Sequence, residues 1–571
     1  MDENVISNLL MNKREIYFLN QNVFYSYNLY EKSIETYYEP PPTYNVLGID
    51  KRSENSYLGL VEDTSSKEKF FINSMNGVND DVISVEISKN DIIQFFDLPS
   101  LNLILLNVYN NKFKRFILKT IEKKSKKEKI LYESENNVLT INDISKGENY
   151  IIFTENTFQD KLNIRLIDLQ EREVYIDVSK PISIKKIKFS EDKSFIYLLS
   201  DEFTEYHSIY SLNIENLREG KLIDRYNKIY LSIERDIDDF LEHQGNLILL
   251  INNNGLSEIH KLYKNKLKII DLKKEGLING LASNKEHIIF KISNVNLPLD
   301  IGVINTKMEI EYLNFNQEND KIIISHLNYK ISNKGPFINV YTQRGKSLED
   351  RPPFILLHGG PHQQERPGYD KLREILVGIG YVVICPNYHG SSGYGKNYRK
   401  SSHKKWGEAD LYDINLVYKW IIEQKIFDNK KIVIAGISYG AYLTLLEVSK
   451  NKNDYDKALA LSGPVDLHAF LKNMPEYTQK ILYERVGKLE EEEKLIENSP
   501  INYISNIKCP IFIAYGKKDN KIDTESVQKY INLCKIHKKE IDYLVFKDEG
   551  HSINKPENVN LLFKKAIEFL G

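Results

Sequence analysis

The sequence predicts two domains, an all-β propeller of seven blades over residues 1–315 and a doubly wound α/β domain with a mainly parallel sheet over residues 316–571. The first prediction rests on strand-like apolar runs that recur about every 45 residues. The second rests on apolar runs that alternate with amphipathic helical stretches. The length of 571 residues is enough for more than one domain.

Seven apolar runs mark the repeat of the first domain, and each is followed by a polar turn. Several of the turns lead into a second strand-like run. A period in the forties built from strands is typical of propeller blades, which bury their faces against one another. The alternative is an all-β region whose strands recur at this spacing by chance. The runs begin at Glu15, Tyr57, Leu101, Tyr150, Phe195, Leu247 and His287.

The second domain is predicted from six buried strands with helices between them. In the stretch 413–424, Ile414, Val417, Trp420 and Ile421 fall on one face of a helix. Strands that alternate with such helices form a mainly parallel sheet covered on both faces. The predicted strands are residues 354–357, 381–385, 431–436, 457–463, 509–516 and 541–546.

A candidate nucleophile lies between the third of these strands and the helix after it. The pattern Gly-x-Ser-x-Gly at residues 436–440 follows the apolar run and precedes a predicted helix. This strand–turn–helix context is that of the nucleophile elbow of the α/β-hydrolase fold. Gly436 and Gly440 allow the strand and the helix to approach closely, and the Ser438 hydroxyl is then exposed at the turn.

A serine hydroxyl needs a base to become a strong nucleophile. His551 follows the last predicted strand, and Asp519 follows the strand before it, in the order serine, acid, histidine. We expect His551 to move the Ser438 proton, and Asp519 to orient the imidazole and stabilise its charged form. Asp523 and Asp548 are the alternative acids.

A second motif, His-Gly-Gly-Pro-His at residues 358–362, follows the first predicted strand of this domain. Such a loop supplies one backbone N–H of an oxyanion hole, and the residue after the nucleophile supplies the other. We therefore predict that Gly360 and Tyr439 donate to the oxyanion. His358 and His362 are expected to shape the loop.

Taken together, these segments resemble the prolyl oligopeptidase family of serine peptidases, and most closely its acylaminoacyl-peptidase branch. The resemblance covers about the last 250 residues and implies a propeller before the hydrolase domain. It also implies hydrolysis of short peptides, as an exo- or oligopeptidase, through an acyl-enzyme. The segments are HGGPH at 358–362, NYHGSSGYG from Asn387, WGEADLYD from Trp406, GISYG from Gly436, SPINYISNIKCP from Ser499, GKKD ending at Asp519 and EGHS around His551.

Some positions depart from the family or leave alternatives open. His389 stands where family members often carry arginine, and no paired-glutamate motif for a free amino terminus is assigned. The resemblance implies that apolar residues of the segment 463–471 help to line the S1 pocket. Val465 and Phe470 are the candidates, with ordinary core packing as the alternative.

Composition narrows the partners and the compartment. Lys and Arg number 78 against 80 Asp and Glu, a net charge of −2, which argues against a nucleic-acid-binding protein. The sequence contains no apolar run of about 18 residues, so we expect no membrane-spanning helix. Its 3 Cys are too few for a disulfide scaffold. The first residues show no apolar segment of a secretory signal. We expect a cytoplasmic protein that acts on short peptides without a cofactor or metal ion, and copies of which can form a homo-oligomer.

Two other functions remain open at this level. An esterase, an amidase or an acyl-transferring enzyme would use the same three side chains, because the acyl chemistry is shared. A propeller-based binding protein with an inactive hydrolase domain is the remote alternative, and the presence of Ser438, Asp519 and His551 argues against it.

Overall fold

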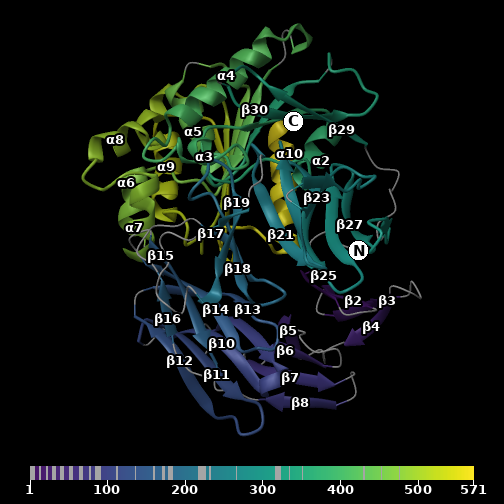
Figure 1. The fold of residues 1–571 in the computed structure, drawn as a ribbon. Coiled ribbons are helices and arrows are strands. Elements are labelled where there is room, and N and C mark those ends of the chain that lie inside the picture. Colours follow the sequence, from purple (N-terminus) through teal and green to yellow (C-terminus); the bar gives the residue numbers. More distant parts are fainter. Residues whose placement is uncertain are drawn as a thin grey trace.

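The computed structural model describes most of the chain, and Figure 1 shows it with one domain stacked on the other. The predicted boundary between residues 315 and 316 lies outside the described residues. The described residues are 7–11, 15–20, 23–28, 34–38, 44–50, 56–63, 69–75, 79–83, 92–110, 113–135, 137–157, 161–169, 174–177, 184–215, 227–229, 233–264, 266–314, 323–333, 335–349, 351–427, 431–451, 453–474 and 476–571.

The N-terminal domain contains seven antiparallel sheets of four consecutive strands among the described residues, which confirms the seven-bladed propeller. The first four sheets contain β1 (Ser7–Met11), β2 (Glu15–Asn20), β3 (Val23–Asn28), β4 (Ile34–Tyr38), β5 (Tyr44–Asp50), β6 (Ser56–Asp63), β7 (Lys69–Met75), β8 (Asn79–Ile83), β9 (Ile92–Leu98), β10 (Leu103–Asn110), β11 (Arg115–Glu122), β12 (Glu128–Ser134), β13 (Val138–Ile144), β14 (Tyr150–Thr157), β15 (Lys161–Asp168) and β16 (Val174–Asp177). The other three contain β17 (Ile184–Phe189), β18 (Phe195–Ser200), β19 (Ser208–Asn213), β20 (Asn227–Lys228), β21 (Ile237–His243), β22 (Asn246–Asn253), β23 (Leu256–Tyr263), β24 (Lys266–Ile269), β25 (Leu277–Ser283), β26 (Ile288–Asn294), β27 (Leu297–Ile304) and β28 (Ile310–Tyr312).

The blades bury their apolar faces against their neighbours. The side chains of β22 are buried on both faces over most of the strand, as expected for a sheet covered on two sides. Each described core cluster of this domain draws on two successive blades. One cluster joins Ile152 and Leu166 to Ile196 and Leu198, for example. The first strands of several neighbouring blades contact each other, namely β5 and β9, β13 and β17, and β21 and β25, and the contact between β1 and β25 closes the ring.

The C-terminal domain is built on a sheet of eight strands in the order β29-β30-β32-β31-β33-β34-β35-β36. The strands β31 to β36 pair in parallel, which confirms the predicted α/β-hydrolase fold, whereas β29 and β30 form an antiparallel edge. The strands are β29 (Ile324–Lys330), β30 (Phe337–Gln343), β31 (Pro353–Leu357), β32 (Val382–Asn387), β33 (Val433–Ile437), β34 (Lys457–Leu461), β35 (Ile511–Gly516) and β36 (Ile541–Phe546).

Helices cover both faces of this sheet. Buried residues of α4, α5 and α9 pack on one face, and residues of α2 and α10 pack on the other. In α4, Ile414, Val417 and Ile421 are buried as predicted, and Trp420 packs at the edge of the same cluster. The helices are α2 (Lys371–Gly378), α3 (Lys396–Lys400), α4 (Ala409–Glu423), α5 (Tyr439–Lys450), α6 (Leu467–Asn473), α7 (Glu476–Arg485), α8 (Glu492–Glu497), α9 (Thr524–Ile536) and α10 (Pro556–Leu570).

The parallel arrangement brings the carboxyl ends of β31, β33, β35 and β36 to one edge of the sheet. This is the edge at which doubly wound sheets bind their ligands. Within the described part of the chain, every helix is too short or too polar to cross a lipid bilayer.

Candidate active site

Ser438 occupies a sharp turn between β33 and α5. Its backbone has φ 57° and ψ −116°, a left-handed conformation that is rare for a residue with a side chain. The turn needs glycine on either side because the backbone segments touch. A Cβ on Gly436 would lie 2.2 Å from the carbonyl of Gly440, and a Cβ on Gly440 would lie 2.3 Å from the Leu357 oxygen. The pattern read from the sequence therefore forms a nucleophile elbow.

The three predicted side chains meet at the edge of the sheet. The Nε2 atom of His551 lies 2.9 Å from the Ser438 hydroxyl, and its Nδ1 atom lies 2.7 Å from an oxygen of Asp519. Asp519 also accepts a hydrogen bond of 2.8 Å from the backbone N–H of Lys521, which fixes its carboxylate. A continuous chain of hydrogen bonds thus runs from the hydroxyl through the imidazole to the carboxylate.

The two alternative acids have other partners. Asp523 lies at the start of α9, where its carboxylate accepts a hydrogen bond from Ser526. Asp548 is on the surface and forms an ion pair with Lys555. Neither of these two contacts involves His551, so the geometry favours Asp519.

Gly360 and Tyr439, the two predicted N–H donors, line the cavity that contains Ser438 and His551. The loop that carries Gly360 is held by His358, whose Nδ1 atom lies 2.7 Å from the Gly359 oxygen and whose Nε2 lies 2.9 Å from the Ser391 hydroxyl. Burial lowers the pKa of His358 to about 4, so its ring is neutral near pH 7. His358 therefore shapes the loop, as the sequence predicts.

His362 has a similar place on the same loop. Its Nδ1 atom donates to the Gly390 oxygen over 2.9 Å, and its Nε2 atom lies 3.1 Å from Nε2 of His403. Burial lowers the pKa of His362 to about 4 as well. The ring thus links the loop to Gly390 and His403.

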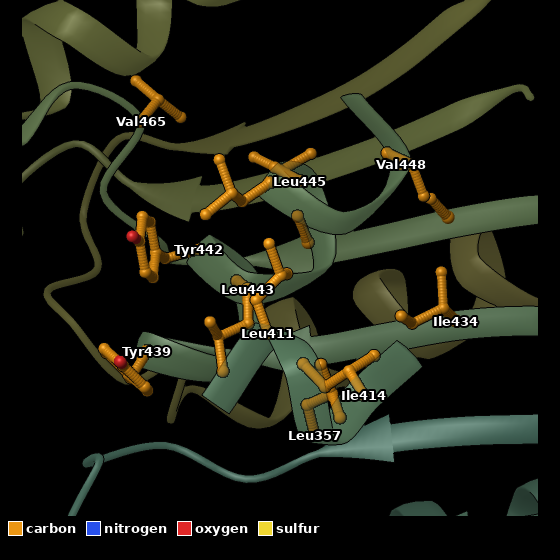
Figure 2. Packing of buried hydrophobic residues seen from close by; sticks show 14 of the residues in the cluster. Leu357, Leu411, Ile414, Ile434, Tyr439, Tyr442, Leu443, Leu445, Val448 and Val465 are labelled. Carbon is orange, nitrogen blue, oxygen red and sulfur yellow. The ribbon is translucent and has the colours of Figure 1, made fainter. Parts of the chain in front are cut away.

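The cavity beside Ser438 has a volume of about 410 Å³. One wall is apolar, and Phe470, one of the two predicted pocket residues, belongs to it. Val465, the other one, is not among the lining residues, because the loop after β34 directs its side chain into the core (Figure 2). The lining residues are Gly360, Trp406, Ser438, Tyr439, Pro464, Phe470, Met474, Leu482, Arg485, Asn520, Lys521, Ile522 and His551.

Several residues in the wall of this cavity were not predicted from the sequence. Trp406 stacks on Phe470 with ring centres 6.3 Å apart, and Met474 and Leu482 come from the region of α6 and α7. Trp406 begins one of the segments that carry the family resemblance, and this was the one sign in the sequence of a role at the site. The others are ordinary apolar residues, and only the fold brings them to the cavity.

His389, which departs from the family pattern, contacts Asp413 and does not line the cavity of Ser438. Its Nδ1 atom lies 2.6 Å from a carboxylate oxygen of Asp413, and this contact raises the pKa of the imidazole. His389 lines a different cavity, of about 630 Å³, with residues of both domains.

Polar contacts join the two domains near the site. Arg366, in the loop after residue 362, forms an ion pair of 2.7 Å with Asp238 of β21 and donates to the Gly255 oxygen over 2.8 Å. Arg399 of α3 forms an ion pair with Asp201. The described residues contain no group of three or more His, Cys, Asp or Glu side chains placed to hold a metal ion.

Comparison with known proteins agrees with this geometry. Residues 367–571 match the model of the prolyl oligopeptidase family. Dipeptidyl aminopeptidase BIII of Pseudoxanthomonas mexicana is 28% identical over 230 residues, which are 39% of this chain and 33% of that protein. An acylamino-acid-releasing enzyme of Arabidopsis thaliana is 27% identical over 235 residues, which are 39% of this chain and 31% of that protein. The matched segments thus span about a third of the length of these relatives.

Solved structures resemble the whole chain. A puromycin-hydrolyzing peptidase of Mycobacterium tuberculosis aligns with a TM-score of 0.80 at 14% identity, over 98% of this chain and 93% of that one. An acylaminoacyl peptidase of Pyrococcus horikoshii aligns with a TM-score of 0.78 at 15% identity, over 99% of this chain and 95% of that one. At such identities the likeness establishes the fold, a propeller followed by a hydrolase domain.

Proposed function

We propose that this chain, whose C-terminal part belongs to the prolyl oligopeptidase family, is a serine peptidase that hydrolyses short peptides through an acyl-enzyme. The observation that carries the proposal is the relay from Ser438 through His551 to Asp519, with separations of 2.9 Å and 2.7 Å. The relay opens into a cavity large enough for a side chain, which is where a substrate would be attacked.

The chemistry follows from the positions of these atoms. The Ser438 oxygen attacks the scissile carbonyl while His551 Nε2 takes its proton, and His551 then gives this proton to the leaving amine. A water molecule hydrolyses the acyl-enzyme by the same route in reverse. Asp519 keeps the imidazole in the required tautomer, and the N–H groups of Gly360 and Tyr439 stabilise the negative oxygen of each tetrahedral intermediate.

The cavity supports a preference for an apolar side chain next to the scissile bond. Trp406, Phe470, Met474, Leu482 and Ile522 provide apolar surface on its walls. Burying such a side chain contributes about 1.5–3 kcal/mol of binding free energy. Val465, which lies behind this wall, would act on the pocket only through packing.

The stacked propeller supports a restriction to short or unfolded chains. Blades of the propeller contact the hydrolase domain through Arg366 and Arg399, close to the loop that carries Gly360. We infer that the propeller, held by these contacts, keeps folded proteins from Ser438. Similar rates of cleavage for a folded protein and for a short peptide would contradict the restriction.

A panel of peptides tests the proposal. We expect cleavage of short peptides that carry an apolar residue before the scissile bond, and mass spectrometry of products from blocked and free-amino peptides will show which amino terminus is accepted. The relatives named above include both an acylamino-acid-releasing enzyme and a dipeptidyl aminopeptidase. The panel therefore distinguishes cleavage of peptides with a blocked amino terminus from cleavage of peptides with a free one. The Ser438→Ala variant is the control, and cleavage at the wild-type rate by this variant would overturn the proposal.

Esterase or acyl-transfer activity is the second candidate, since the same relay attacks esters. Peptide p-nitroanilides compared with short p-nitrophenyl esters separate the two candidates. A peptidase should cleave the anilides that fill the apolar wall, whereas an esterase should cleave the esters and leave the anilides intact. The inactive binding protein would show neither activity.

We also infer that the two domains meet between residues 315 and 316 and that the protein acts in the cytoplasm. The last strand of the propeller ends at Tyr312 and the hydrolase sheet begins at Ile324, which supports the boundary. The three cysteines are buried free thiols, as is usual in a reducing compartment. Limited proteolysis and cell fractionation test these two points.

A further inference from the structure

A buried carboxylate lies behind the nucleophile and takes no part in the relay. Asp410, in the first turn of α4, is fully buried and accepts a hydrogen bond from the phenol of Tyr439. Its second oxygen accepts a hydrogen bond of 2.8 Å from the backbone N–H of Leu411. Among the described residues, no ion pair neutralises this carboxylate, although burying an unpaired charge is costly.

Tyr439 connects this carboxylate to the reacting atoms. It follows Ser438 directly, and its backbone N–H is one of the two groups proposed to bind the oxyanion. Its ring is 2% exposed and packs edge-on against Trp406, with ring centres 4.5 Å apart. Figure 2 shows the ring among core residues, near Leu411 of α4. The side chain thus anchors the turn from behind while the backbone faces the cavity.

We propose that Asp410 is a positioning residue which, by accepting the Tyr439 hydrogen bond, holds the Tyr439 backbone N–H in line with the oxyanion and the Trp406 ring in the cavity wall. This inference rests on the proposed function. An oxyanion donor acts through its direction and distance, and the loss of one costs about 10²–10³ in kcat. A buried carboxylate without a cationic partner among the described residues is then retained because it fixes this donor.

The charge state of Asp410 gives the proposal a pH signature. Burial raises the pKa of Asp410 to about 7, against the opposing effect of the hydrogen bonds from Tyr439 and Leu411. The other titratable groups around it are Asp413 on α4, Glu408 before that helix, Tyr388, Tyr442 on α5 and His389. As the pH falls through about 7, the ionised acceptor is lost and the Tyr439 hydrogen bond weakens. Activity then falls as Asp410 is protonated.

The variants Tyr439→Phe and Asp410→Asn test the proposal. Each should lower kcat by about 10- to 100-fold with KM within about 2-fold, because the affected contact is made to the transition state. The double variant should be no worse than the poorer single variant, because both changes remove the same contact. Tyr442→Phe is the matched control. It removes another buried phenol on α5, bonded to the Asn498 oxygen at 2.9 Å, and should leave kcat within about 2-fold.

The pH profile and the melting temperature exclude a purely structural role. The acid limb of log kcat/KM should be steeper in the wild type than in Asp410→Asn, where the Asp410 ionisation is absent. Because the pKa of Asp410 is higher in the folded than in the unfolded protein, its contribution to stability is lost as the pH rises from about 4 to about 7. The melting temperature of Asp410→Asn relative to wild type should therefore rise over that range.

The outcomes separate this inference from the proposed function. If Ser438 reacts with a fluorophosphonate and the wild type cleaves peptides, but Tyr439→Phe and Asp410→Asn both keep kcat within 2-fold, the positioning role is wrong. An equal loss in Tyr442→Phe would also overturn it. If the wild type neither reacts nor cleaves, the proposed function itself fails. Should Asp410→Asn not fold, Tyr439→Phe, which lacks a single oxygen atom, decides the question.

Discussion

Ser438 combines a left-handed backbone with a hydroxyl that already contacts its base. The backbone strain at this residue is held by the glycines around it and by the hydrogen bond of 2.7 Å from the Ser438 N–H to the Leu461 oxygen. The hydroxyl itself supports none of this framework. Reactivity and stability are therefore separable at this position.

Replacing Ser438 by alanine should lower kcat by about 10⁶-fold, because the nucleophile is lost. The melting temperature should stay near the wild-type value, since the elbow keeps its backbone contacts. Steady-state kinetics and thermal unfolding measure the two effects. A large fall in melting temperature would contradict the assignment of this residue to the surface of the turn.

Replacing Asp519 by asparagine should lower kcat by about 10⁴-fold, because the imidazole then loses the acceptor that sets its tautomer. The matched control is Asp548→Asn, which removes a surface carboxylate paired with Lys555. The control should keep kcat near wild type, as surface ion pairs contribute little. Equal kinetic losses in the two variants would contradict the assignment of Asp519 as the acid that orients His551.

At the scale of the elements, the elbow works because β33 and α5 touch. The sequence predicts this contact, since two glycines flank the serine at the end of an apolar run. It also predicts the second strand of every blade, such as β14 at Tyr150 and β18 at Phe195, because these central strands are apolar on both faces. Strands such as β24, with mostly exposed side chains, lack that pattern and were missed.

The substitution Gly436→Ala should destabilise the hydrolase domain by about 1–3 kcal/mol and lower activity, because the new Cβ would lie 2.2 Å from the Gly440 backbone. Gly345→Ala is the comparison. That position has φ +74° but nothing within 4 Å of the new atom, so it reports backbone strain alone. Denaturant unfolding and kinetics on both variants test the prediction. Full activity in Gly436→Ala would mean that the turn is looser than described.

At the scale of the whole molecule, polar contacts hold the propeller against the hydrolase domain. Arg366 links them through the Asp238 carboxylate, the Gly255 oxygen and, over 3.1 Å, the Ser257 hydroxyl. No local sequence pattern reveals these contacts, because they join segments more than 100 residues apart. The residues of the cavity walls could not be predicted from the sequence either, because residues such as Leu482 and Ile522 come together only in the folded domain.

Removing this link should relax the size limit on substrates. We expect Arg366→Ala to raise the cleavage of a folded protein relative to a short peptide, because the propeller is held less firmly against the hydrolase domain. Lys185→Ala is the control, since Lys185 binds the same Asp238 carboxylate from within the propeller. The ratio of the two kcat/KM values measures the effect. An unchanged ratio in Arg366→Ala would contradict a gating role for this contact.

The most direct measurement is active-site labelling of the folded wild-type protein with a fluorophosphonate, followed by peptide mapping by mass spectrometry. A nucleophile activated by His551 and Asp519 predicts one adduct, on Ser438, whose formation is abolished by unfolding and strongly slowed in Asp519→Asn. An unlabelled folded protein, or an adduct on another residue, would contradict the central claim.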